Sequence, residues 1–218
     1  VVQNITNIRK QLPKHVQLVC VSKFHPVEAI QTAYDLGERI FGESRAQELV
    51  EKQARLPKDI EWHFIGSLQT NKVKQVVPLA TLIHSVDSIK LLEAINRYAE
   101  NQHIISHLLL EVHVAKEDTK HGFSIEEIKT FFSHKSWEAY PAVRICGLMT
   151  MGTNGVTEEA NRTEFELVAN LFKEIQQTFE TPYFKTLSMG MSNDYKIALE
   201  AGSNMVRIGS SIFGNRTY

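Results

Sequence analysis

Short apolar runs alternate with longer segments that carry apolar residues at helical spacing, and this alternation extends along the whole chain. The apolar runs have the length and β-branched content of strands buried on both faces, which is typical of parallel sheets. They predict eight strands, at residues 16–22, 39–41, 61–65, 81–84, 108–114, 143–149, 184–187 and 205–208. Strands that alternate with helices predict parallel crossovers within a single sheet.

The segments between the apolar runs predict helices. Residues 88–101 place Leu91 and Ile95 on one face at helical spacing. Ser124 and Glu127 have the spacing of a capping box at the start of a later helix. The other predicted helices cover 27–36, a segment that ends near 56, 70–77, 158–179 and 194–201, with a short turn after 209.

Eight strand–helix repeats at this chain length predict a closed (β/α)8 TIM barrel. No linker, low-complexity tract or block of like charge divides the chain, so we expect a single domain that covers residues 1–218. An open doubly wound sheet is the alternative, because the apolar run at 39–41 is weak.

The charges nearly cancel, with 24 basic and 25 acidic side chains and a formal net charge of -1. This balance gives no electrostatic case for binding nucleic acid or an anionic membrane. No apolar run approaches the roughly 20 residues of a membrane span, and the first residues do not resemble a signal peptide. Cys20 and Cys146 lie inside apolar segments, which predicts buried free thiols in a reducing, cytoplasmic compartment.

The nine histidines are scattered without metal-ligand spacing. His113 and His121 flank a polar loop at 115–122, but no cysteine or third histidine completes a site. We therefore expect no metal.

Lys23 follows the first apolar run, at the rim where parallel barrels carry their chemistry. Val19, Val21 and Lys23 share one parity, which points Lys23 into the barrel while Cys20 packs against the helices. Desolvation lowers the proton affinity of an amine, and a neutral amine can condense with an aldehyde. The alternative is that Lys23 caps the strand in solvent.

Two loops at the same end of the predicted barrel suit a phosphate group. One loop contains Met191 and Ser192 after strand seven, and the other contains Gly209 and Ser210 after strand eight. Glycine permits close backbone approach, hydroxyls can donate hydrogen bonds, and barrels commonly bind phosphate with these two loops. The alternative, that glycine and serine only form good turns, is weaker for two neighbouring loops than for one.

Further candidates lie at the ends of other strands. Arg207 on strand eight faces either the barrel or a helix; inside the barrel its permanent charge can hold a phosphate or face a ring nitrogen. Ser44 follows strand two, His63 lies on strand three and Met149 closes strand six. His63 is either a ligand contact or a satisfied core histidine, and core packing is the favoured energetic role of Met149.

A reactive lysine beside a phosphate-binding pair of loops predicts a phosphorylated aldehyde as the ligand. Pyridoxal 5′-phosphate (PLP) meets both demands, because its aldehyde can form a Schiff base with lysine while its phosphate anchors it. A barrel that binds some other phosphate is the remaining alternative.

Several segments, in the same order along the chain, match one known family. They are Val21-Ser22-Lys23, Phe41-Gly42-Glu43, Trp62-His63-Phe64-Ile65-Gly66, Ile83-His84-Ser85-Val86-Asp87, Gly147-Leu148-Met149-Thr150-Met151, Leu187-Ser188-Met189-Gly190-Met191-Ser192 and Val206-Arg207-Ile208-Gly209. On these segments the chain resembles the pyridoxal phosphate homeostasis proteins (the YggS/PROSC type) over nearly its whole length. That family looks like the barrel domain of alanine racemase.

The resemblance implies that Lys23 carries PLP as a Schiff base and that Arg207 lies near the pyridine nitrogen. It implies that Ser192, Gly209 and Ser210 hold the phosphate. The family usually has asparagine where this chain has Ser44, so a shorter hydroxyl replaces an amide there.

The resemblance also implies a function: PLP homeostasis by a carrier without turnover. Our own hypothesis adds that the protein passes PLP to apo PLP-dependent enzymes, and we expect a monomer or weak dimer. The alternative is a PLP-dependent amino-acid racemase. Racemisation needs a base on each face of the α-carbon, and Lys23 can serve one face. In alanine racemases a tyrosine from a second domain serves the other. We expect no such domain here, because the sequence stops at Tyr218.

Overall fold

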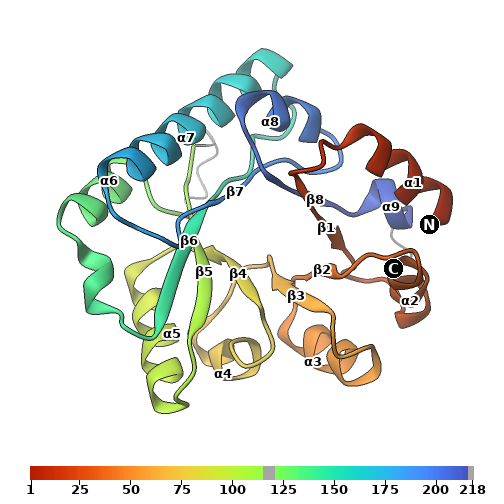
Figure 1. Cartoon of the computed structure of the whole chain (residues 1–218), viewed down its shortest axis with the longest axis horizontal. Helices are drawn as coiled ribbons and strands as arrows, with labels where there is room; N and C mark the ends of the chain where they lie inside the picture. The colour runs from red at the N-terminus through yellow and green to blue at the C-terminus, as the bar shows by residue number, and fades with distance from the viewer. Residues whose placement is uncertain (115–120, 216–218) are drawn as a thin grey trace.

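The computed structural model describes residues 1–114 and 121–215, and in this part of the chain eight parallel strands close into a barrel (Figure 1). Each strand pairs with the next along the chain, and β8 pairs with β1. The strands are β1 (Gln17–Val21), β2 (Ile40–Glu43), β3 (Glu61–Phe64), β4 (Leu82–Val86), β5 (Ser106–Glu111), β6 (Val143–Met149), β7 (Thr186–Ser188) and β8 (Met205–Ile208). The predicted (β/α)8 barrel is confirmed, and the open doubly wound sheet is wrong.

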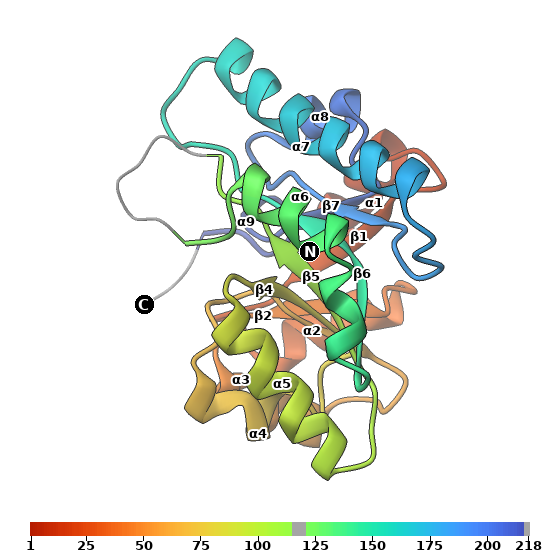
Figure 2. The ribbon, with the colours of Figure 1, turned by 90° about the vertical axis from the view of Figure 1, so that its left-hand side faces the viewer.

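Helices surround the strands as an outer layer (Figure 1). In the view of Figure 2, α3, α4 and α5 lie on one side of the strands and α7 and α8 on the other. The helices are α1 (Val2–Gln11), α2 (Val27–Asp35), α3 (Ala46–Arg55), η1 (Thr70–Lys72), α4 (Val73–Val76), α5 (Ile89–Asn101), α6 (Ile125–Ser133), η2 (Ser136–Ala139), α7 (Glu158–Thr178), α8 (Tyr195–Ala201) and α9 (Ser210–Phe213). The predicted capping box at Ser124 is present, with both reciprocal hydrogen bonds to Glu127.

Some predicted element boundaries agree with the structure and others differ from it. β6 and β8 span the predicted residues, but the weak run at 39–41 is a strand that continues to the buried Glu43. The helix expected at 70–77 is the 3-10 turn η1 followed by the short α4. The helix α1 was not predicted. Most of the loop expected at 115–122 lies outside the described residues.

The core has an outer shell and an inner cluster. Val19 belongs to the cluster inside the barrel with Leu82, Leu109, Met149 and Met205, whereas Cys20 belongs to the shell between strands and helices. The alternation predicted for β1 is therefore confirmed. Buried polar side chains at His63, His84, Glu111 and Arg207 also lie on the strands.

Cys20 and Cys146 are free thiols, as expected, although only Cys20 is fully buried. Within residues 1–114 and 121–215, no helix combines the length and apolar character needed to cross a membrane. The same residues bring together no group of three or more histidine, cysteine, aspartate or glutamate side chains that could hold a metal ion.

Candidate functional site

A cavity of about 260 Å³ lies at the carboxyl ends of the strands, the end of the barrel where the sequence places its candidate chemistry. Seven of the predicted site residues line it: Lys23, Ser44, Met191, Ser192, Arg207, Gly209 and Ser210. Its wall also contains Val21, Ile65, Met151, Asn154, Asn193 and Asp194. The predicted residues His63 and Met149 are not among the lining residues.

A second pocket, of about 240 Å³, lies at the opposite end of the barrel and is walled by aromatic residues that include Trp137, Tyr140 and Tyr183. Its polar lining residues include Arg144, whose guanidinium lies 5.1 Å from the centre of the Tyr183 ring. Neither lysine nor cysteine lines this pocket. Barrel chemistry sits at the carboxyl ends of the strands, so the cavity with Lys23 is the functional candidate.

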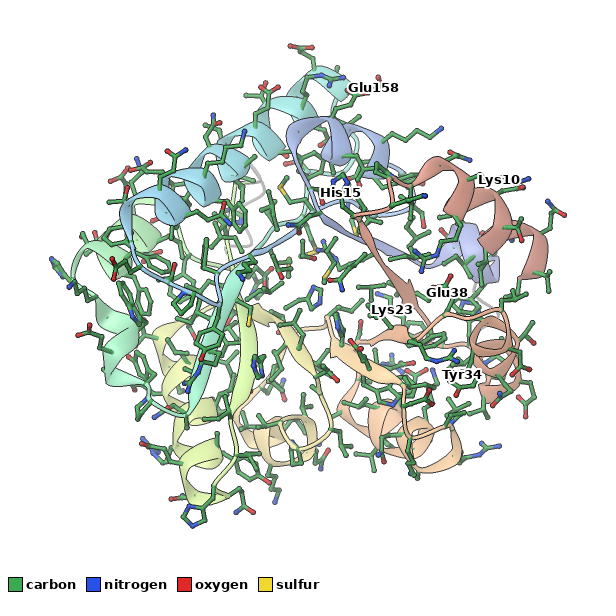
Figure 3. The ribbon with its side chains drawn as sticks, viewed as in Figure 1. Lys10, His15, Lys23, Tyr34, Glu38 and Glu158 are labelled. Carbon is green, nitrogen blue, oxygen red and sulfur yellow. The ribbon has the colours of Figure 1, made fainter. Side chains whose placement is uncertain are left out.

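Lys23 enters the cavity from the segment that follows β1. Figure 3 shows it nearer the middle of the ring of strands than Lys10 and Glu158, which lie on outer helices. The side chain is half-buried. Lys23 lies two residues beyond the end of β1 at Val21, and both residues line the cavity. The alternative of a lysine that only caps the strand in solvent is therefore disfavoured.

The loops after β7 and β8 meet through one serine. The Oγ atom of Ser192 accepts hydrogen bonds from the backbone N–H groups of Gly209 and Ser211, at 3.3 and 3.4 Å. Gly190, in the loop after β7, has φ +101°, and a Cβ there would lie 2.8 Å from the Cα of Tyr195. Only glycine allows this loop to fold so closely onto α8.

Arg207 is 4% exposed and faces the barrel rather than a helix. Its Nη1 donates to the carbonyl oxygen of Ser188 at 3.0 Å and to the Ser188 hydroxyl, and its Nη2 donates to the carbonyl oxygen of Thr150 at 3.0 Å. Burial lowers the pKa of Arg207 to about 10, opposed by the nearby carboxylates of Glu111 and Asp194. The guanidinium therefore stays charged at neutral pH and is fixed in orientation.

His63 lies beneath the cavity in a buried chain of hydrogen bonds. Its Nδ1 lies 2.8 Å from Nε2 of His84, and Nδ1 of His84 lies 3.0 Å from the hydroxyl of Ser188. Burial lowers the pKa of His63 to about 3 and that of His84 well below its ordinary value. Both rings are therefore neutral, and the chain leads through Ser188 to Arg207. This position favours the satisfied core histidine over a direct ligand contact.

Met149 is 1% exposed and packs in the inner cluster, which is the packing role favoured from the sequence. Met151, two residues further, lines the cavity instead.

Acidic residues are the part of the site that the sequence analysis missed. Glu111 is buried at the end of β5, and burial raises its pKa to about 7, with Asp87 raising it further and Arg207 lowering it. A glutamate directly after Leu108-Leu109-Leu110 was the available signal. Asp194 lines the cavity, where its Oδ1 accepts a hydrogen bond from the N–H of Met191 at 2.7 Å, and burial raises its pKa.

Comparisons with known proteins point to one family. The family model described as "Alanine racemase, N-terminal domain" matches residues 1–217. A curated relative from Aquifex aeolicus, named "Pyridoxal phosphate homeostasis protein", is 39% identical over 203 residues, which cover 93% of this chain and 88% of the relative.

Solved structures agree with this assignment. PipY of Synechococcus elongatus PCC7942, solved without PLP, is 36% identical, with a TM-score of 0.90 and coverage of 97% of this chain and 99% of PipY. The PipY structure with PLP bound gives a TM-score of 0.87 at the same identity and coverage. Alanine racemase of Clostridium difficile 630 shares only the fold, with 15% identity, a TM-score of 0.77 and coverage of 99% of this chain and 59% of that one.

The match to the family model and the identity to curated relatives each extend over nearly the whole chain. The protein belongs to the alanine racemase N-terminal domain family and, within it, to the pyridoxal phosphate homeostasis proteins.

Proposed function

We propose that this protein binds PLP in the cavity at the carboxyl ends of its strands and serves PLP homeostasis, with residues 1–218 acting as one domain. The observation that carries the proposal is that the amine of Lys23 and the guanidinium of Arg207 line the same cavity as the Ser192–Gly209 contact. The name of the Aquifex relative and the PLP-bound structure of PipY support the choice of ligand.

The donor set fits a phosphorylated aldehyde. Among the residues that line the cavity, the hydroxyls of Ser192 and Ser210 can donate hydrogen bonds to a phosphate group, and the Gly209 N–H, which donates to Ser192 Oγ at 3.3 Å, holds Ser192 in place. In the same cavity Lys23 supplies an amine, which forms a C=N bond with an aldehyde while water leaves. Ser44 lines the same cavity and offers a hydroxyl to the ring substituents.

Arg207 is proposed to face the pyridine nitrogen. Its bonds to Ser188 and Thr150 fix the guanidinium, and a fixed cation at that nitrogen disfavours its protonation. A pyridine ring that stays unprotonated is a weaker electron sink, which suits holding PLP more than turning over an amino acid.

A carrier is favoured over a racemase by the acid–base groups around the cavity. Racemisation needs a base on each face of the α-carbon. Among the described residues that line the cavity, the carboxylate is Asp194, and its Oδ1 already accepts a hydrogen bond from Met191. One oxygen of this carboxylate is therefore already engaged by the protein backbone, which favours a carrier over a racemase.

Delivery of PLP to apo PLP-dependent enzymes is part of the same proposal, supported by the exposed Met151 and Ser210 at the mouth of the cavity. We further propose that the protein is a monomer or weak dimer. We also propose a cytoplasmic location, which the two free thiols support.

The test combines transfer and turnover. The PLP-loaded protein is mixed with an apo PLP-dependent enzyme, and holo-enzyme formation is compared with that at the same concentration of free PLP. The loaded protein is separately incubated with L-alanine, and optical rotation is followed. We expect faster holo-enzyme formation than with free PLP and no loss of rotation. Racemisation at a rate typical of enzymes would favour the alternative, and transfer no faster than from free PLP would remove the delivery function.

A further inference from the structure

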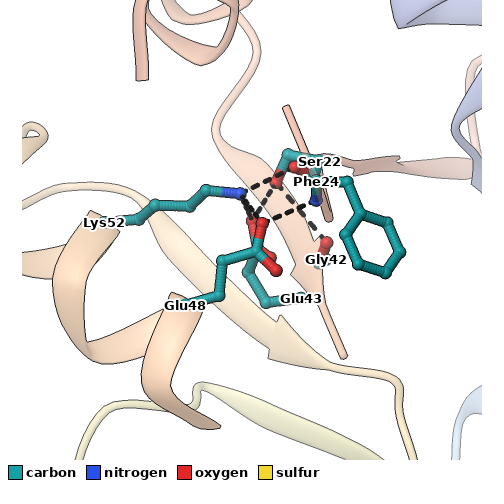
Figure 4. A network of polar contacts seen from close by, with 6 residues as sticks. All are labelled: Ser22, Phe24, Gly42, Glu43, Glu48 and Lys52. Carbon is teal, nitrogen blue, oxygen red and sulfur yellow. Dashed lines mark hydrogen bonds and ion pairs between the residues drawn. The ribbon is translucent and has the colours of Figure 1, made fainter. Parts of the chain in front are cut away.

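The two residues that flank Lys23 are both bonded to side chains of α3. The carbonyl oxygen of Ser22 accepts a hydrogen bond from Nζ of Lys52 at 2.7 Å (Figure 4). The backbone N–H of Phe24 donates to Oε1 of Glu48 at 2.6 Å. The backbone on each side of Lys23 is therefore bonded to the neighbouring strand–helix unit, in addition to the local bond of 3.1 Å from the His25 N–H to the Ser22 carbonyl oxygen.

One buried ammonium connects these contacts. Nζ of Lys52 lies 2.7 Å from the carbonyl oxygen of Ser22, from Oε1 of Glu43 and from Oε1 of Glu48, which uses all three of its donors. The hydroxyl of Ser22 also donates to Oε1 of Glu43 at 2.6 Å. We call Glu43, Glu48 and Lys52 the Lys52 cluster.

The Lys52 cluster is expected to add little net stability to the fold. The side chains of Lys52, Glu43 and Glu48 are 8%, 0% and 18% exposed, and the desolvation of buried charges offsets much of their attraction. Buried charges are better explained where they specify one arrangement of the chain. Here the specified arrangement is the segment that contains Lys23.

That segment also holds a strained residue. Phe24 has φ +66°, a left-handed conformation that is rare for a bulky aromatic residue and persists only where the surroundings enforce it. The guanidinium of Arg45 lies 4.5 Å from the centre of the Phe24 ring, and the ring of His25 stacks on Phe213 at 5.0 Å. Ser22, Phe24 and His25 are each held by a contact from another part of the chain.

We propose that the Lys52 cluster is a positioning device for Lys23, which fixes its backbone so that the amine is presented to the aldehyde of PLP. The inference rests on the proposed function of Lys23. Lys52, Glu43 and Glu48 do not line the cavity, so they act through the backbone of residues 22–24. A lysine side chain is long and flexible. Fixing the backbone of Lys23 therefore limits the positions that its amine can reach.

Three variants distinguish the hydrogen bond to the Phe24 N–H from the charges of the Lys52 cluster. Glu48→Ala removes the acceptor for the Phe24 N–H, whereas Glu48→Gln keeps an acceptor oxygen at the same length. Lys52→Met keeps the aliphatic stem and removes the ammonium. If Lys52→Met fails to fold because two carboxylates lose their cation, the Glu48 pair still decides the question, because Glu48 is the most exposed member of the cluster.

Glu38→Gln is the matched control. Glu38 is also a buried glutamate paired with a cation, Arg9, and it lies just before β2, whereas Glu43 ends that strand. It belongs to the opposite end of the barrel and does not line the cavity. Loss of the Glu38 charge should lower the melting temperature without changing the rate at which Lys23 reacts with PLP.

Two readouts are measured on each protein. The first is the rate at which PLP becomes trapped on the protein in the presence of borohydride, at sub-saturating PLP. The second is the exchange rate of the Phe24 amide hydrogen in the protein without PLP. For Glu48→Ala we expect trapping to slow about tenfold or more and the Phe24 amide to exchange faster, with Glu48→Gln and Glu38→Gln close to wild type in both.

Wild-type trapping and exchange rates in Glu48→Ala would overturn the inference. So would a Glu38→Gln protein that traps PLP as slowly as Glu48→Ala, because the effect would then follow general stability. If wild type itself traps no PLP on Lys23, the proposed function fails. The amide exchange then still decides whether the cluster fixes the Lys23 segment: faster exchange in Glu48→Ala with recovery in Glu48→Gln supports it, and unchanged exchange overturns it.

Discussion

The guanidinium of Arg207 is bonded twice to Ser188, through the carbonyl oxygen at 3.0 Å and through the hydroxyl. The same hydroxyl lies 3.0 Å from Nδ1 of His84. The one charged group of this chain of hydrogen bonds therefore lies at the cavity, and its neutral imidazoles lie deeper in the barrel. This order supports our proposal that Arg207 binds the ligand and that the histidines give structural support.

Replacing Arg207 by glutamine should weaken PLP binding, because a charged donor becomes a neutral one. The loss of one charge-assisted hydrogen bond is worth about 1.5–3 kcal/mol, or roughly 10- to 150-fold in the dissociation constant. An absorbance titration with PLP measures it. Wild-type affinity in Arg207→Gln would place the guanidinium away from the ligand, and unfolding in urea checks that the variant is folded.

His63 should make the protein acid-labile. Its pKa in the folded state is lowered to about 3 by burial, from an ordinary value of 6.5. Below pH 6.5 the unfolded chain therefore takes up a proton that the folded protein excludes. The free energy of unfolding should fall by about 1.4 kcal/mol per pH unit from this group as the pH drops from 6.5 toward 3.

His63→Gln should remove that slope and keep a hydrogen-bonding side chain beside His84. Urea unfolding at pH 7 and pH 5 provides the measurement, and His15→Gln, at an exposed histidine before β1, is the control. If the free energy of unfolding falls equally from pH 7 to pH 5 in wild type and in His63→Gln, the lowered pKa of His63 is contradicted.

Glu111 should have the opposite pH dependence. Burial raises its pKa in the folded state to about 7, so the folded protein keeps a proton that the unfolded chain has lost above about pH 4.5. Its contribution to stability therefore decreases as the pH rises from 4.5 to 7. Glu111→Gln, which resembles the protonated acid, should equal wild type near pH 4.5 and be more stable at pH 8, by about 3 kcal/mol. A pH-independent difference between the two proteins in urea unfolding would be inconsistent with a buried titrating Glu111.

Gly190→Ala should be more harmful than Gly202→Ala. Both glycines have a positive φ, +101° and +113°, but a Cβ at Gly190 would lie 2.8 Å from the Tyr195 backbone, whereas a Cβ at Gly202 would meet nothing within 4 Å. The two variants share the cost of backbone strain, and Gly190→Ala adds overpacking of about 1–3 kcal/mol. Thermal unfolding gives the difference in stability, and PLP titration should show weaker binding only for Gly190→Ala. Equal losses in both assays would mean that the loop after β7 tolerates a side chain.

The barrel could be predicted from the sequence because short apolar runs mark the strands and alternate with segments of helical spacing. The opposite directions of Val19 and Cys20 followed from the period of two along β1. Helix α1 was not predicted, because its buried residues are only Ile5 and Ile8 within a polar segment. Its amphipathic signal is too short and sparse to distinguish a helix from a loop.

The polar interior could not be predicted, because it depends on register between distant strands. His63 and His84 lie 21 positions apart, and His84 and Ser188 lie 104 apart. Glu43 and Lys52 are charged residues at buried positions, which runs against the pattern that identifies strands and helices. Hydrophobic periodicity locates the strand ends, and the glycine and serine content of the loops identifies much of the cavity lining, but neither identifies the side chains that hold the lining in place.

The central claim is that Lys23 binds PLP covalently, and the absorbance spectrum of the purified protein with added PLP tests it most directly. Wild type should show a band near 420 nm, roughly where a Schiff base of PLP absorbs, which borohydride bleaches irreversibly. Lys23→Ala should lack this band while retaining the thermal stability of wild type. A protein that stays colourless with PLP, or a Lys23→Ala variant with the same bleachable band, would contradict the account.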